Sequence, residues 1–357
     1  MKMKVAVVGA TGIAGQQFLA TLADHPLFEV TALAASGRSA GKPYIEALKD
    51  KNGSIGWWCE GMPSRDFQGM VVQDASRLEA ADFSIVFTAI ESDAARELEP
   101  KYAKTTPVIS TASAFRMEQD VPLLIPGVNS GHAALLERQR KERGWKGFVV
   151  PIPNCTTTGL AVSLKPLQDA FGLERVLMTS MQAISGAGRN GGVLGLDITE
   201  NVIPYIPGEE EKVQQETQKI LGAFEGDHVH PTHFPVSATC TRVAVLDGHT
   251  EAVYLSTSRR ASVEEAAEVL RGFDGGLSGL HSAPERMIRV TDDPFRPQPR
   301  RDREIDGGMC TVVGRLREDS ALDNGLKYVL LSHNTKMGAA KGAVLVAELL
   351  HKEGQIR

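Results

Sequence analysis

The sequence predicts an α/β protein with two domains, the first a doubly wound parallel sheet and the second of α+β type. The chain has 357 residues, and one hydrophobic core stops growing at roughly 250–300 residues, so we expect two domains. In the first half, short apolar strand-like segments alternate with helical ones, which is typical of a parallel sheet with helices on both faces. Longer strand-like segments follow, at 176–185 and 251–259. We therefore place the domains at residues 1–153 and 154–331.

The composition excludes several classes of protein. Apolar residues make up 42% of the chain, yet no segment has the ~20 consecutive apolar residues that a membrane span needs. The formal net charge of −5 gives no basic surface for nucleic acid. The N-terminus "MKMKVAVVGATG" enters a strand with no room for a signal peptide. We expect a cytoplasmic protein with no membrane or nucleic-acid partner.

The four cysteines are scattered along the chain and form no CxxC pair, so the sequence predicts neither a disulfide framework nor a zinc site. They are Cys59, Cys155, Cys240 and Cys310. Three histidines in "DHVHPTH" (227–233) have the spacing of metal ligands, but no cysteine or carboxylate pattern completes a site. We interpret this segment as a loop and expect no metal.

The segment 4–25 carries a nucleotide-binding pattern between a strand and a helix. Gly9, Gly12 and Gly15 follow the spacing GxxGxxG, with Thr11 and Ile13 inside the turn. Glycine permits a tight turn and close approach of the backbone to a pyrophosphate, whose charge a helix N-terminus favours. In this position the pattern predicts a Rossmann-like dinucleotide-binding domain.

The next strand, 28–35, indicates which dinucleotide binds. An NAD site would place a carboxylate near the end of this strand for the ribose 2′-hydroxyl. Here the strand runs into "SGRSAGK", which offers Ser36, Arg38, Ser39 and Lys42 but no carboxylate. Two hydroxyls and two cations suit a 2′-phosphate, so we expect NADP. The alternative is an ordinary polar loop.

Two further buried strands are expected at 83–90 and 107–116. Ligands of doubly wound sheets bind at the carboxyl ends of the strands. Thr88, Ala89 and Ser113, which are among the small residues toward the ends of these segments, should therefore face the cofactor.

Cys155 lies in "PIPNCTTTGL", where an apolar strand turns into a helical pattern. A helix N-terminus lowers the pKa of a thiol, and the thiolate is the nucleophilic form. A catalytic nucleophile is therefore one interpretation. For an isolated cysteine, a buried structural thiol is the other.

Five motifs in order resemble the aspartate-β-semialdehyde dehydrogenases, and "NCTT" is similar to their archaeal and fungal branch. These motifs are "PNCTTTGLAVSLKPL", "SGAGR", "GEEEK", "TRVAVLDGHTEAV" and "HNTKMGAAKGAVLVAELL". The resemblance implies NADPH-dependent reduction of L-4-aspartyl phosphate to L-aspartate 4-semialdehyde with release of phosphate. This step belongs to the biosynthesis of lysine, threonine, methionine and isoleucine. The resemblance also implies a homodimer or homotetramer, and a C-terminal helix (332–357) that completes the NADP-binding domain.

The resemblance also assigns roles to single residues. Cys155 would attack the acyl phosphate to form a thioester. His249 would act as acid and base, a role that the unperturbed histidine pKa of about 6.5 suits. Asn154 and the backbone N–H of Cys155 would stabilise the oxyanion. The other residues with implied roles are Gln182, Arg242 and Glu209 for substrate, Arg116 and Lys212 for phosphate, and Ser185, Gly186 and Asn334 near the cofactor. Glu210 remains an alternative to Glu209.

Two other functions remain open at this level. A malonyl-CoA or succinyl-CoA reductase on the same scaffold would keep the cysteine, histidine and arginine and differ in the leaving group. A non-catalytic NADP-binding sensor would keep only the fold. N-acetylglutamyl-phosphate reductase is disfavoured because its Gly-Cys-Tyr run is absent here.

Overall fold

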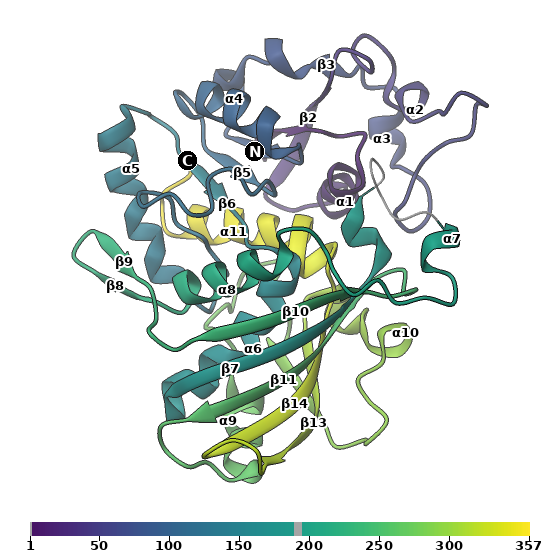
Figure 1. Ribbon diagram of the computed structural model, residues 1–357. Helices are drawn as coiled ribbons and strands as arrows, with labels where there is room; N and C mark the ends of the chain where they lie inside the picture. The colour runs from purple at the N-terminus through teal and green to yellow at the C-terminus, as the bar shows by residue number, and fades with distance from the viewer. Residues whose placement is uncertain (1, 189–194) are drawn as a thin grey trace. The chain divides into compact units, whose positions relative to one another are not determined.

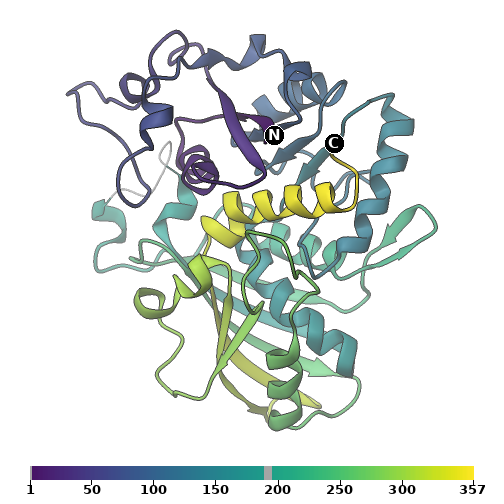
Figure 2. The ribbon, with the colours of Figure 1, turned by 180° about the vertical axis from the view of Figure 1, so that it is seen from behind.

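The computed structural model describes residues 2–188 and 195–357, and their secondary structure is drawn in Figures 1 and 2. Contacts within the chain divide it into two compact units. The first comprises the chain up to Leu123, Ala133–Ile152 and Ala343–Arg357, and the second comprises Leu124–His132 and Pro153–Gly342.

The first unit contains a parallel sheet with the strand order β3-β2-β1-β4-β5-β6. Its strands are β1 (Met3–Val8), β2 (Phe28–Ala35), β3 (Gln73–Asp74), β4 (Ile85–Thr88), β5 (Val108–Ser110) and β6 (Val149–Pro151). The order reverses between β1 and β4, which creates the switch point where such sheets bind ligands. The predicted doubly wound parallel sheet is confirmed.

Helices cover both faces of this sheet. On one face, Phe18 packs against Phe87 with ring centroids 5.0 Å apart. On the other face, Val8 and Val86 join Leu98 and Tyr102 in a buried cluster. The elements of this part of the chain are α1 (Ile13–Leu22), α2 (Tyr44–Ala47), α3 (Arg65–Gln68), η1 (Ala75–Arg77), η2 (Ala80–Asp82), α4 (Ser92–Ala103), η3 (Ser130–Ala134) and α5 (Leu135–Arg143).

The C-terminal helix α11 (Lys341–Lys352) contributes its later turns to the first unit. His25 Nε2 and Glu348 Oε1 lie 2.9 Å apart, and both side chains are fully buried. A buried carboxylate is stable only when it is paired or hydrogen-bonded, so this contact fixes the helix to the loop before β2.

The second unit contains a mixed sheet with the order β10-β7-β11-β14-β13-β12. Its strands are β7 (Leu173–Gln182), β10 (Val236–Arg242), β11 (His249–Thr257), β12 (Ile288–Thr291), β13 (Thr311–Asp319) and β14 (Gly325–Ser332). Two pairs are parallel, β10 with β7 and β12 with β13, and the other pairs are antiparallel. This confirms the α+β character expected for the second half.

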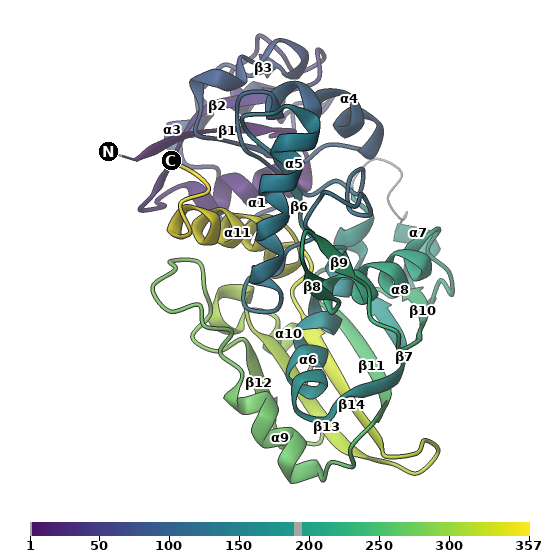
Figure 3. The same cartoon turned by 90° about the vertical axis from the view of Figure 1, so that its left-hand side faces the viewer.

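Helices of the second unit pack on this sheet from one side, as Figure 3 shows for α6 and α9. The elements that accompany the sheet are α6 (Cys155–Phe171), η4 (Ile184–Ala187), α7 (Gly195–Ile198), α8 (Glu209–Ile220), α9 (Val263–Gly272), α10 (Pro299–Asp302), η5 (Ile305–Gly308) and the π-turn η6 (Lys336–Ala340). On the uncovered side, Leu177 and Tyr254 are 41% and 39% exposed.

Three local expectations differ from the structure. The histidine segment expected to be a loop forms a small hairpin of β8 (Ala223–Glu225) and β9 (His228–His230). The stretch 292–308, whose Pro- and charge-rich composition predicts a loop, contains α10 and η5. The C-terminal segment 332–357, expected to be a single helix, is broken at Ala339, whose φ and ψ are −149° and −115°.

Every helix in the described residues is too short or too polar to span a bilayer.

Candidate active site

Asn154 determines where helix α6 begins. Its Oδ1 accepts hydrogen bonds from the backbone N–H groups of Thr156 (2.9 Å) and Thr157 (3.3 Å), so it is the N-cap. Cys155 is then the first helical residue, where unpaired N–H groups and the helix dipole favour an anion. The chain therefore folds locally into a position that stabilises a thiolate.

Cys155 Sγ lies 3.1 Å from Nε2 of His249, the first residue of β11. The other ring nitrogen, Nδ1, accepts a hydrogen bond from the backbone N–H of Ala183 at 3.1 Å. Because an N–H group donates to Nδ1, the neutral ring carries its proton on Nε2. That proton points at the sulfur, so the neutral histidine donates to Cys155.

The environment of His249 differs from the expectation of an ordinary histidine. The side chain is 0% exposed. Burial, and next the neighbouring Arg242 and His333, lower the pKa of His249 to about 3. His249 is therefore neutral near pH 7, and the expected pKa of about 6.5 is corrected because the ring lies in the protein core.

Arg242 places a guanidinium beside this pair. It ends β10 directly opposite Gln182 of β7, and its Nη1 donates to the carbonyl oxygen of Ala183 at 2.7 Å. A Cβ added to Gly186 would lie 3.1 Å from Arg242 Nη1 and 3.2 Å from His249 Cε1. The turn at Gly186 therefore packs closely against both side chains, and a larger residue there would push on them.

Asn154 also connects Cys155 to the acidic start of α8. Its Nδ2 donates to Glu209 at 2.9 Å, and its backbone N–H donates to Glu216 at 2.6 Å. Lys212 lies 3.8 Å from the same Glu209 carboxylate, one helical turn away. Glu210 instead accepts from the backbone N–H of Cys240 at 2.9 Å, so Glu209 is the glutamate on the Cys155 side.

The hydrogen bonds of Asn154 differ from the role expected for it. Its carbonyl oxygen caps the helix and one amide proton goes to Glu209. Only its remaining amide proton is left for an oxyanion. Gln182 is 1% exposed, and its Nε2 donates to Ser180 at 3.2 Å.

Asn334 and Ser185, which the sequence assigned to the cofactor, contact one another. Asn334 Nδ2 donates to Ser185 Oγ, and Asn334 Oδ1 accepts from the backbone N–H of Gly248, both at 2.8 Å. Asn334 therefore joins the turn before His249 to the "SGAG" turn. Arg189, which ends that motif, lies outside the described residues.

Glu251 is a buried group near this site that the sequence did not single out. It lies two residues after His249 on the same face of β11, beside Ser180 and Leu330 in the sheet register. It is 0% exposed, and neither carboxyl oxygen has a hydrogen-bond partner among the described residues. Burial raises the pKa of Glu251 well above its ordinary value, so the group is a neutral acid.

Other contacts of the site could not be read from the sequence. The Glu216 carboxylate accepts from the backbone N–H of Asn154, and the backbone N–H of Ala183 donates to His249. Gly338 lies against Cys155. A Cβ on Gly338 would lie 2.8 Å from Cys155 Cβ, so glycine is required where η6 crosses the start of α6. No sequence spacing connects these residues, and only the fold brings them together.

The glycine turn of the first unit has the geometry that a dinucleotide needs. Gly9 has a φ of +83°, and an added Cβ would lie 2.1 Å from the carbonyl oxygen of Ala89. A Cβ on Gly15 would lie 2.1 Å from the carbonyl oxygen of Gly9, so α1 packs closely on the turn. Gly12 is the N-cap of α1 and has no side chain to satisfy the first N–H groups. Thr11 and Ile13 flank this cap and are partly exposed.

The loop after β2 presents hydroxyls and cations as expected. Ser36, Arg38 and Lys42 are exposed, and Ser39 is half-buried. The structure adds Asp74, which pairs with Ala35 in the sheet register. Its carboxylate is held by Ser76 through the backbone N–H and the hydroxyl, at 2.9 and 2.7 Å.

The remaining expected cofactor and phosphate residues lie farther along this sheet. Thr88 is 0% exposed and donates its hydroxyl to Glu99 at 2.6 Å, so this side chain does not face the cofactor as expected. The carboxyl group of Glu99 is buried and accepts hydrogen bonds from the hydroxyls of Thr88 and Ser110. A buried carboxyl group is costly without such donors. Ser113 bonds Ser92 at 2.7 Å, and Arg116 Nη2 donates to the carbonyl oxygen of Thr111 at 2.9 Å.

Comparison with known proteins shows where this chain belongs. Two family models match it, the semialdehyde dehydrogenase NAD binding domain at residues 4–136 and the semialdehyde dehydrogenase dimerisation domain at residues 164–337. The aspartate-semialdehyde dehydrogenase of Archaeoglobus fulgidus is 49% identical over 360 residues, covering 99% of each chain. That of Methanothermobacter thermautotrophicus is 47% identical, covering 98% of this chain and 99% of the relative. The chain belongs to the aspartate-semialdehyde dehydrogenase family.

A solved structure of this family agrees with the fold over the full length. The structure of aspartate semialdehyde dehydrogenase with NADP from Candida albicans matches with a TM-score of 0.89 and 41% identity, covering 99% of this chain and 100% of that one. The archaeal and fungal resemblance is therefore confirmed. A CoA-thioester reductase is not favoured, because relatives at this level of identity are named aspartate-semialdehyde dehydrogenases.

Proposed function

We propose that this chain catalyses the NADP-dependent interconversion of L-4-aspartyl phosphate and L-aspartate 4-semialdehyde through a thioester on Cys155. The observation that carries the proposal is the 3.1 Å contact between Cys155 Sγ and His249 Nε2 at the start of α6. It rests also on membership of the aspartate-semialdehyde dehydrogenase family. The reaction serves amino-acid biosynthesis in the cytoplasm.

The thiolate begins the reductive direction. Its sulfur attacks the carbonyl carbon of the acyl phosphate, a C–S bond forms, and the C–O bond to phosphate breaks as phosphate leaves. The helix N-terminus and the guanidinium of Arg242 stabilise the thiolate, and the Nε2–H of His249 donates to it. Hydride delivery to the thioester carbon is the chemistry that NADPH supplies. When the C–S bond then breaks, the aldehyde is released and the thiolate is restored.

Charged side chains of the second unit suit the amino-acid part of the substrate. Arg242 offers a fork of N–H donors for the α-carboxylate. Glu209 offers a carboxylate for the α-ammonium, and Lys212 offers a cation for phosphate. Arg116 of the first unit is the second phosphate ligand that we propose.

The residues of the first unit fit NADP. The positive φ of Gly9 and the uncapped start of α1 suit a pyrophosphate. The exposed Arg38 and Lys42, with Ser36 and Ser39, suit a 2′-phosphate. We accordingly assign residues 1–153 with 332–357 to cofactor binding and 154–331 to catalysis and dimerisation.

The oligomer that we propose is a homodimer or homotetramer. It uses the side of the second sheet opposite α6 and α9, where Leu177 and Tyr254 are exposed. Exposed apolar surface of this kind is typical of an interface between copies.

The proposal is tested by phosphate-dependent reduction of NADP⁺ with L-aspartate 4-semialdehyde, measured for the wild type and Cys155→Ala. We expect activity that requires phosphate and that is lost in Cys155→Ala. Activity that requires coenzyme A with malonate or succinate semialdehyde would instead identify the CoA-thioester reductase. NADPH binding with no turnover of either substrate would support the sensor.

A further inference from the structure

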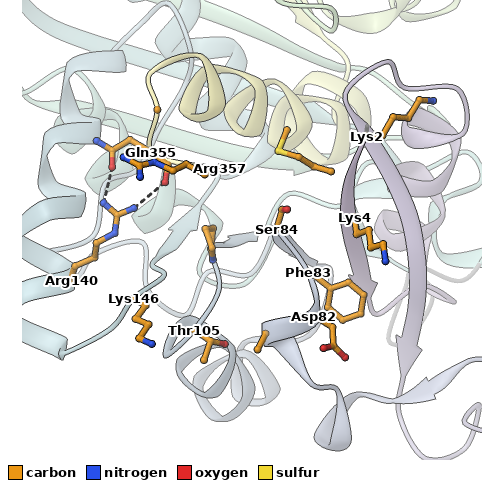
Figure 4. Close-up of a pocket in the computed structure, with 14 residues that line it drawn as sticks. Lys2, Lys4, Asp82, Phe83, Ser84, Thr105, Arg140, Lys146, Gln355 and Arg357 are labelled. Atoms are coloured by element: carbon orange, nitrogen blue, oxygen red, sulfur yellow. Dashed lines mark hydrogen bonds between the residues drawn. The ribbon is translucent and has the colours of Figure 1, made fainter.

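The first unit contains a hollow that the proposed reaction does not use. Its volume is about 730 Å³, within the range of small-molecule sites. Figure 4 shows its lining, with Lys2 and Lys4 on one side and Lys146 and Arg357 on the other. Arg140 is the fifth basic residue in the lining, and Asp82 is the one acidic residue.

The charge of this hollow contrasts with the rest of the protein. Counted over side chains alone, the five basic residues and Asp82 give a formal charge of +4, whereas the side chains of the whole sequence give −5. None of the five cations forms an ion pair with a carboxylate in the part of the chain that the structure describes. Like charges around one concave surface repel each other and focus the field inside it, so a bound polyanion would be stabilised.

Part of the lining is held in place before any ligand binds. The guanidinium of Arg140 donates through Nη1 to Gln355 Oε1 at 2.7 Å and through Nη2 to the Gln355 carbonyl oxygen at 3.1 Å. It also stacks on Phe148, 5.0 Å from the ring centroid. A guanidinium fixed in this way loses little entropy when it meets a phosphate. Ser84 adds a hydroxyl group, and Phe83 adds an apolar wall.

The hollow lies at the opposite edge of the sheet from the glycine turn. Lys2 precedes β1 and Lys4 is its second residue, Ser84 precedes β4, and Lys146 precedes β6. The turn at Gly9 follows the carboxyl end of β1. A six-residue strand spans roughly 20 Å, so the two sites are separate.

We propose that this hollow is a second anion site, which binds a run of linked phosphates. A single phosphate carries too little charge to engage cations on both sides of a cavity of this size. A di- or triphosphate carries charge enough, either as free oligophosphate or as part of a nucleotide whose base packs on Phe83. The proposal does not depend on the reaction assigned to Cys155.

Calorimetric titration of the full chain, saturated with NADP to occupy the cofactor site, tests the proposal with tripolyphosphate as the probe. We expect Lys4→Gln/Lys146→Gln to weaken binding by about tenfold or more, because two charged contacts are lost. The control Lys51→Gln/Lys101→Gln has the same net charge and alters exposed lysines elsewhere in this unit, so it should bind as the wild type does. Asp82→Asn should bind several-fold more tightly, because it removes the carboxylate from the lining.

Two further measurements decide the source of the ligand and the validity of the site. ATP that binds as tightly as tripolyphosphate identifies a phosphate run alone, whereas tighter binding of ATP identifies a nucleotide. No binding to the NADP-saturated wild type, or equal binding by Lys4→Gln/Lys146→Gln and the control, would overturn the proposal. Orthophosphate binding as tight as that of tripolyphosphate would also overturn it.

Discussion

At the scale of the residue, the Cys155–His249 pair depends on which histidine nitrogen carries the proton. The backbone N–H of Ala183 occupies Nδ1, and the buried ring has a pKa of about 3. If the ring were protonated, its Nδ1–H would face the backbone N–H of Ala183, and two donors repel each other. Protonation would also place a positive charge in the protein core, which is unfavourable. His249 is therefore a fixed hydrogen-bond donor to sulfur at neutral pH, and in the proposed reaction it also donates to the oxyanion that develops nearby.

His249→Gln should lower kcat by a factor of about 100–1,000, the usual effect of losing one preorganised donor. Because the pKa of His249 is about 3, the ring does not titrate between about pH 5.5 and 8. The loss should therefore be the same across that range. The pH profiles of kcat/KM for wild type, His249→Gln and the exposed control His233→Gln measure this. An inflection near pH 6.5 that only His249→Gln lacks would contradict it.

Glu251→Gln should make the protein more stable at neutral pH. The pKa of Glu251 is raised in the folded state, so the unfolded chain releases this proton above about pH 4.5 while the folded chain retains it. The contribution of this group to stability is thus complete at low pH and is lost as the pH rises. A neutral amide has no such loss, and we expect Tm to rise by roughly 2 °C or more at pH 7.

Thermal unfolding at pH 4.5 and pH 7 measures this difference. Glu268→Gln, an exposed position of α9, is the control and should behave as the wild type does. An equal effect of Glu251→Gln at both pH values would show that Glu251 ionises in the folded protein.

At the scale of the element, the start of α6 is defined by its cap and by what crosses it. Asn154 ends the preceding segment and leaves Cys155 at the first helical position. The break at Ala339 divides the C-terminal segment into η6 and α11, and the close contact of Gly338 with Cys155 lies in η6. The small residue Gly338 thus makes room for Cys155 where the two segments cross.

Gly338→Ala should reduce activity by more than about tenfold, because the new Cβ would lie 2.8 Å from Cys155 Cβ and the backbone must shift. Gly272→Ala is the matched control, since a Cβ there meets nothing within 4 Å. Turnover and the rate of Cys155 alkylation are measured for both variants. Full activity of Gly338→Ala would mean that η6 does not pack tightly against Cys155 at the start of α6.

At the scale of the whole molecule, the two sheets differ in what covers them. Helices cover both faces of the parallel sheet, whereas the mixed sheet has α6 and α9 on one side. The uncovered side carries Leu177 and Tyr254, at 41% and 39% exposure. A sheet face with apolar residues of this kind is stable when a second copy covers it.

Leu177→Asp/Tyr254→Asp should therefore dissociate the oligomer to chains of 38.5 kDa. Charged residues on that face cannot be desolvated in an interface without large cost. Light scattering during gel filtration measures the mass. Phe295→Asp, at an exposed loop residue with 78% exposure, is the control and should leave the mass unchanged. A wild type that already runs as a single chain would refute the oligomer.

Local pattern was enough to predict much of the fold and part of the site. Segment 28–35 forms β2 with the predicted bounds, and the glycine turn lies between β1 and α1 as expected. Glu209 and Lys212 of the motif "GEEEK" lie three residues apart on α8, and their charged groups are 3.8 Å apart. These features depend on residues close in the chain, whose periodicity and turn chemistry the sequence displays directly.

The sequence by itself determined the doubly wound sheet, the second α+β unit and the position of Cys155 at a helix start. Only the tertiary structure decided that His249 is a neutral donor and that Glu251 is buried with no hydrogen-bond partner among the described residues. It also decided that Asn334 holds the turn before His249 and that the Thr88 hydroxyl donates to Glu99. These properties depend on burial and on atoms from distant segments. Charge, tautomer and orientation respond to the surroundings in space, and a one-dimensional pattern does not contain those surroundings.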